Sequence, residues 1–117
     1  MNFTRFGFLL NVKDLPQCRS FYRDMLHLGP PVLDSAFTVE FALSDKMVLR
    51  LEQNSCPALE HASSAGCLIL ECDDPQKLFD ELADAGYEVE MREESRDSGH
   101  YFRGMDPEGN FFYVTRG

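Results

Sequence analysis

The first apolar stretch of the chain runs from Phe3 to Val12 with few polar breaks. Because successive side chains of a strand point to opposite faces, the stretch divides into two sets. The bulkier set is uniformly apolar and should face a core, whereas the smaller, more polar set suits a cavity. The first set is Phe6, Phe8, Leu10 and Val12, and the second is Gly7, Leu9 and Asn11.

A helical pattern follows this strand. Asp14 is a suitable N-cap, and Pro16 fits just inside the start of a helix. Apolar residues then recur at helical spacing up to Gly29-Pro30-Pro31, which cannot continue a helix. The helix should therefore end near Leu28. Two strands are predicted beyond it, at 37–43 and 47–52, joined by a turn at 44–46.

The second half of the chain repeats this order. A strand at 66–72 leads into a helix that Asp73-Asp74-Pro75 begins and Gly86 ends. Equivalent positions are about 60 residues apart, so that Asp14 falls with Asp74. Three more strands are predicted at 87–93, 100–105 and 111–115, with a polar loop at 94–99 and a turn at 106–110.

This order predicts an α+β fold of tandem βαβββ modules in a single domain. Module one takes about residues 1–53, a small and polar connector 54–65, and module two 66–117. Identity between the halves is low, so the repeat is inferred from the order of the elements. An ordinary α+β domain without duplication is the alternative.

Two motifs at the ends of the chain resemble the vicinal oxygen chelate superfamily, which includes glyoxalases, bleomycin resistance proteins and dioxygenases. They are Val12-Lys13-Asp14-Leu15-Pro16-Gln17-Cys18-Arg19-Ser20-Phe21-Tyr22, similar to the start of that family's first helix, and Asp106-Pro107-Glu108-Gly109-Asn110-Phe111, similar to its closing hairpin. The resemblance implies that the modules form a curled mixed sheet around a ligand cavity. It also implies a homodimer.

The resemblance assigns four positions to the ligands of a divalent ion, one on the first and one on the last strand of each module. They hold Gly7, Arg50, Cys67 and Tyr113. Gly has no ligand atom, Arg is a permanent cation, and the remaining two cannot form a site for such an ion. We therefore expect no metal and no other cofactor.

The alternate face of each strand gives a candidate ligand-binding set for the cavity. Its members are Leu9, Asn11, Arg50, Cys67, Ile69, Glu71, Phe111 and Tyr113, to which His100 is added because it lies near a strand that could face the cavity.

Three members of this set allow two interpretations each. Arg50 binds a carboxylate or phosphate of the ligand, or it pairs internally with Glu52 or Glu71. Phe111 and Tyr113 stack on a planar ligand, or they simply fill the concave face of the sheet.

Charge and composition restrict the partners. The chain carries 20 acidic against 11 basic residues, a formal net charge of -9. This balance argues against nucleic acid and anionic membrane surfaces as partners. No apolar run approaches the length of a membrane span, and the four Cys have no CxxC spacing, so we expect reduced thiols and a cytoplasmic location.

Two functions fit this sequence. The first is a metal-free protein that binds a small organic molecule and sequesters an antibiotic or metabolite, as the bleomycin-resistance branch of the family does. The alternative is a small-molecule enzyme, lyase, isomerase or dioxygenase-like. Such an enzyme would use a metal held by other residues, or an acid–base pair such as Glu71 and Tyr113.

Overall fold

The computed structural model describes residues 4–53, 68–95 and 99–116, with the backbone alone at 92–95 and 99–101. The chain divides into two compact units, Met1–Ser63 and Ser64–Gly117, called unit 1 and unit 2 below. The predicted connector, 54–65, lies outside the described residues.

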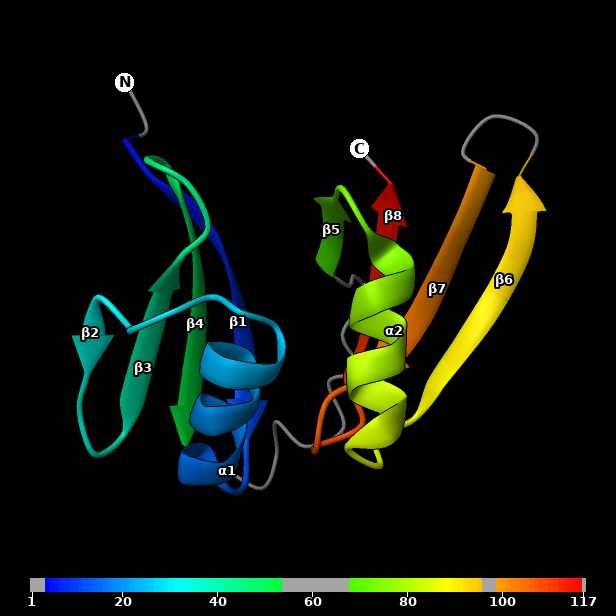
Figure 1. The fold of residues 1–117 in the computed structure, drawn as a ribbon. Helices are drawn as coiled ribbons and strands as arrows, with labels where there is room; N and C mark the ends of the chain where they lie inside the picture. The colour runs from blue at the N-terminus through cyan, green and yellow to red at the C-terminus, as the bar shows by residue number, and fades with distance from the viewer. Residues whose placement is uncertain (1–3, 54–67, 96–98, 117) are drawn as a thin grey trace. The chain divides into compact units, whose positions relative to one another are not determined.

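Unit 1 is a four-stranded mixed sheet with one helical segment (Figure 1). The strands lie in the order β1-β4-β3-β2, with β1 parallel to β4 and the other neighbours antiparallel. The elements are β1 (Phe6–Val12), α1 (Leu15–Ser20), the π-helix η1 (Phe21–Met25), β2 (Leu33–Asp34), β3 (Thr38–Ala42) and β4 (Met47–Gln53).

The helical segment begins where the sequence predicts. The Asp14 carboxylate accepts a hydrogen bond from the Gln17 backbone N–H at 3.1 Å, which satisfies one of the free donors of the first turn. The α-helix is shorter than expected, because the chain widens into η1 from Phe21. Gly29, with φ of 77°, follows this segment in the left-handed conformation that glycine adopts without strain.

The helical segment covers only part of the sheet. It packs on β4 and β3, and the rings of Tyr22 and Phe41 lie 6.5 Å apart. Val12 is fully buried as expected, but Phe6 and Phe8 are 52% and 40% exposed. The prediction that both Phe side chains lie in the core is therefore wrong, because β1 is an edge strand and α1 packs mainly on the two strands beyond it.

Unit 2 has the same architecture. Its strands lie in the order β5-β8-β7-β6, and only the β5–β8 pair is parallel. The Asp74 carboxylate caps the helix through the Lys77 N–H at 3.1 Å, and Phe79 packs edge-to-face on Phe102 at 5.5 Å. The elements are β5 (Leu68–Cys72), α2 (Pro75–Asp84), β6 (Val89–Ser95), β7 (Gly99–Met105) and β8 (Phe111–Arg116).

A hydrogen-bonded turn joins β7 to β8. The buried Asp106 carboxylate accepts hydrogen bonds from the backbone N–H groups of Glu108 and Asn110, both at 2.8 Å, and from the Asn110 side chain at 2.9 Å. Gly109 has φ of 85°, which only glycine adopts without strain. The Asp106 carboxylate therefore accepts hydrogen bonds from turn N–H groups that would otherwise need backbone carbonyls as partners.

The two sheets share one strand order, so the predicted α+β fold of tandem βαβββ modules is confirmed. Two details differ from the prediction. The two-residue strand β2 was not expected, and β6 and β7 extend to Ser95 and Gly99, into the stretch expected to be a polar loop. None of the helices in the described part of the chain has the length and apolar character that a membrane crossing would require.

Candidate functional site

Each sheet has one face opposite its helix, called the open face below. In unit 1, Leu9, Arg50 and Glu40 are register partners across β1, β4 and β3 and project from this face, since the helix packs on the face that carries Phe41. Asn11 and Glu52 form the next partnered pair along the same face. The predicted unit 1 residues Leu9, Asn11 and Arg50 therefore share one surface.

Arg50 is held by Glu40. Its Nε donates to the Glu40 carboxylate at 2.7 Å, and its Nη2 donates to the same oxygen. The other Glu40 oxygen accepts from Arg5 at 2.9 Å. The Glu40 side chain is 5% exposed, whereas the two arginines are about half exposed. Hydrogen bonds from Arg5 and Arg50 hold the pKa of Glu40 below its usual value, and the bond to Glu40 raises the pKa of Arg50.

The expected internal pairing of Arg50 is present, and the structure adds a closer partner. Glu52 forms an ion pair with the Arg50 Nη1 at 3.7 Å, whereas Glu40, which the sequence analysis does not name, makes the shorter contacts. The sequence contained a signal for it. The predicted hairpin turn is centred on Asp45, and residues at equal distances from the centre of a hairpin become partners, which places Glu40 opposite Arg50.

The structure describes three of the four positions that the resemblance assigns to ion ligands. A Cβ at Gly7 would lie 2.7 Å from both the Val48 Cγ2 and the Val48 carbonyl oxygen, so a ligating side chain there would need the strand to shift. Arg50 places a guanidinium at the second position, and Tyr113 stands at the last. Cys67 lies outside the described residues. Within the described ranges no group of three or more His, Cys, Asp or Glu could hold a metal ion.

The open face of unit 2 carries a second guanidinium–carboxylate pair. Ile69, Tyr113, Arg103 and Glu90 are register partners across all four strands. Arg103 bonds to Glu90 at 2.7 Å and lies over the Phe111 ring, 4.4 Å from its centroid. The Glu90 hydrogen bond is the main cause of the raised pKa of Arg103, and Tyr113 contributes. Each open face thus carries an arginine. Arg50 lies on β4, the second strand of its sheet, and Arg103 lies on β7, the third strand of its sheet.

The remaining predicted residues fall as follows. Ile69 and Glu71 lie on β5, paired with Tyr113 and Thr115 of β8, and therefore share the open face of unit 2 with Phe111. His100 belongs to β7, but its side chain is outside the described part of the structure. Contact of these residues with a ligand stays a prediction.

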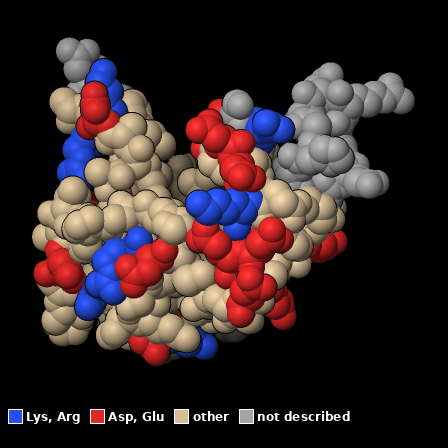
Figure 2. Space-filling view, viewed as in Figure 1, with Lys and Arg blue, Asp and Glu red and all other residues tan. Residues whose placement is uncertain are grey.

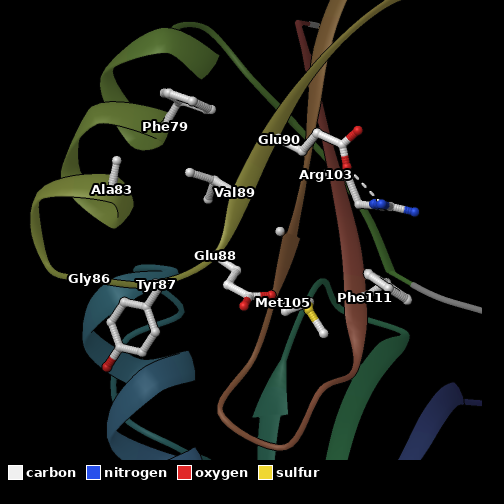
Figure 3. A pocket seen from close by; sticks show the side chains of 11 residues that line it. Phe79, Ala83, Gly86, Tyr87, Glu88, Val89, Glu90, Arg103, Met105 and Phe111 are labelled. Carbon is white, nitrogen blue, oxygen red and sulfur yellow. Dashed lines mark hydrogen bonds and ion pairs between the residues drawn. The ribbon is translucent and has the colours of Figure 1, made fainter.

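A hollow of about 550 Å³ lies within unit 2 (Figure 3). Phe79, Ala83 and Val89 line it on the helix side of β6, and Arg103 and Phe111 lie on the other side. Its volume falls in the range of small-molecule sites. Phe111 is the one predicted site residue among the described lining, which also includes Gly86, Tyr87, Glu88, Glu90, Gly104 and Met105. Sequence reasoning missed the rest because β6 and the end of α2 were not assigned to a cavity.

Comparison with known proteins identifies the family. The sequence model of the Glyoxalase/Bleomycin resistance protein/Dioxygenase superfamily matches residues 5–114. The chain therefore belongs to this superfamily. A search of curated proteins found no match to this chain.

Solved structures share the fold at low identity. Lactoylglutathione lyase from Agrobacterium tumefaciens is 22% identical with a TM-score of 0.75, over 96% of this chain and 92% of that one. TnmS3, an antibiotic binding protein from Streptomyces sp. CB03234, is 22% identical with a TM-score of 0.75, over 96% and 93%. The fosfomycin resistance protein FosX from Listeria monocytogenes is 14% identical with a TM-score of 0.77, over 100% and 95%. At such identities the likeness concerns the fold alone.

Proposed function

We propose that this protein binds a small organic molecule without a metal ion, and so acts by sequestering an antibiotic or metabolite. The observation that carries the proposal is the Arg50–Glu40 pair. A position at which the family resemblance expects an ion ligand holds a guanidinium, fixed by a buried carboxylate. A guanidinium is always protonated and has no lone pair to offer a metal ion.

Two further observations support binding. The hollow in unit 2 combines apolar walls with a few charged groups, the usual composition of a small-molecule site. The structures that share the fold include an antibiotic binding protein and a fosfomycin resistance protein. In this proposal Leu9, Asn11, Arg50, Cys67, Ile69, Glu71, His100, Phe111 and Tyr113 contribute to the ligand surface.

Metal analysis and a ligand screen together test the proposal. We expect purified full-length chain to contain well under one equivalent of zinc, nickel, iron or manganese. We also expect a chelator to leave its melting temperature unchanged, and some members of an antibiotic and metabolite panel to raise it. A stoichiometric metal, lost with a catalytic activity on chelation, would instead establish the enzymatic alternative.

A homodimer and a cytoplasmic location complete the proposal. The homodimer rests on the family resemblance, and light scattering at micromolar concentration should give twice the chain mass of 13.4 kDa. A monomeric mass would refute it. The location rests on Cys18 and Cys72, which are both free thiols, and fractionation of the source cells would test it.

A further inference from the structure

The carboxylate of Glu88 is the unmatched charge of the unit 2 hollow. Within the described part of the chain no cation or hydrogen-bond donor pairs with this side chain, whereas the neighbouring Glu90 is neutralised by Arg103 at 2.7 Å. The three charged groups that line the hollow therefore leave a formal charge of minus one. A ligand with a single positive charge would therefore bring the formal charge of the hollow to zero.

Apolar groups lie in line with this carboxylate. Met105 donates its backbone N–H to the Glu88 carbonyl at 3.1 Å, and Met105 is in turn the register partner of Phe111. Glu88, directly before β6, thus forms a row with Met105 of β7 and Phe111 of β8. The row joins a carboxylate, a thioether and a ring, about 10 Å from end to end at the usual strand spacing. Figure 3 shows the Glu88 carboxylate beside Met105, with the Phe111 ring further along.

The row is accessible and can accept an aromatic cation. Glu88 is exposed and the Phe111 side chain is 43% exposed, so both are available to a ligand. The Phe111 ring already carries a guanidinium at 4.4 Å, which shows that its face accepts a positive charge. The thioether of Met105 is polarizable and packs well against aromatic rings.

The acidic residues around the hollow also favour a positively charged ligand. Residues 71–90 contain eight Asp or Glu against one Lys, and Figure 2 shows acidic side chains gathered over α2. Such a field raises the local concentration of cations and speeds their association.

We propose that the unit 2 hollow binds an arylalkyl amine, whose ammonium group pairs with Glu88 and whose ring system packs on Met105 and Phe111. This inference rests on the proposed small-molecule function and adds the chemical class of the ligand.

Three fluorescent probes with one ring system test it on the full chain. They are 9-anthracenemethylamine, which is protonated at neutral pH, the neutral 9-anthracenemethanol, and anionic 9-anthracenecarboxylate. Fluorescence anisotropy should rank the affinities amine, alcohol, carboxylate, with the amine roughly three- to tenfold tighter than the alcohol at low salt. The advantage of the amine should shrink as salt is added.

Variants assign the preference to one group. Glu88→Gln should remove the advantage of the amine over the alcohol and leave alcohol binding unchanged. Asp84→Asn removes the same charge from an exposed residue that does not line the hollow, and should retain most of the advantage. Arg103→Gln should strengthen amine binding, because it frees both Glu90 and the face of Phe111. Circular dichroism confirms that each variant is folded.

Several results would overturn the inference. The first is an alcohol that binds as tightly as the amine, and the second is an advantage that survives Glu88→Gln. If no anthracene probe binds but the wider panel yields a ligand, the amine site is wrong while the proposed function stands. If neither binds, both fail.

Discussion

Replacement of Glu40 by Gln tests the ionic cluster on the open face of unit 1. The side chain keeps its size and one carbonyl oxygen, but it loses the charge shared by Arg5 and Arg50. The amide nitrogen of the introduced side chain would face a guanidinium and could not accept its hydrogen bond. The variant therefore leaves at least one donor of the cluster unmatched.

The expected loss follows from the exposure of the groups. A fully buried pair that loses one partner costs about 3–5 kcal/mol, and an exposed pair about 0.2–1 kcal/mol. Glu40 is buried, but Arg5 and Arg50 are 52% and 45% exposed and can turn to water. We assign about 1 kcal/mol to each arginine, so that the free energy of unfolding falls by about 2 kcal/mol.

Urea unfolding followed by circular dichroism measures this loss, since the chain has no Trp to report by fluorescence. With a slope of about 1–2 kcal/mol per molar urea, the midpoint should fall by about 1–2 M. Glu52→Gln is the matched control. Its carboxylate lies 3.7 Å from the Arg50 Nη1 and is 36% exposed, so its loss should be about 0.5 kcal/mol or less.

The pH dependence gives a second, independent check. The pKa of Glu40 is lower in the folded chain than its ordinary value of 4.5. Its contribution is therefore fully present above that value and is lost as pH falls through the folded pKa. The difference between wild type and Glu40→Gln should shrink on acidification below pH 4.5. A difference under about 0.5 kcal/mol at neutral pH, or one that stays constant into acid, would refute this account of the cluster.

Substitutions at three further positions test the packing and the turn of the two units by the same urea assay. Gly7→Ala should destabilise by about 1–3 kcal/mol, because its Cβ meets Val48 at 2.7 Å; an unchanged midpoint would mean that position 7 can hold a larger side chain. Leu82→Ala should lose about 2–5 kcal/mol, since Leu82 is the fully buried residue of α2, and a smaller loss would show that the surrounding side chains close the cavity. Asp106→Ala should lose about 2–4 kcal/mol through three unmade hydrogen bonds, whereas Asp106→Asn, which retains one acceptor, should lose less.

The order of elements was predictable because each boundary has a local cause. Asp14 and Asp74 cap their helices through their own side chains, and Gly109 closes the final turn with a positive φ. These signals act over three or four residues and do not depend on the rest of the fold. Alternation predicts the strand faces for the same reason, and so described members of the open faces, such as Leu9 with Arg50 and Ile69 with Tyr113, could be grouped from the sequence.

The elements that the sequence did not reveal depend on tertiary contacts. Strand β2 has two residues, too few for any period to show, and exists because it pairs with Val39 and Glu40. The exposure of Phe6 and Phe8 depends on how far α1 extends across the sheet. The hollow in unit 2 depends on the path of β6 past the end of α2, which no residue pattern encodes.

The two open faces share one charge arrangement. In each unit an arginine lies in the middle of the face and is held by a carboxylate on a neighbouring strand, Glu40 in one and Glu90 in the other. The carboxylate neutralises the guanidinium, so the pair needs no further ion for neutrality. The charges that remain unmatched then determine what binds. In unit 2 that charge is the carboxylate of Glu88, and in our proposal it makes this face selective for organic cations.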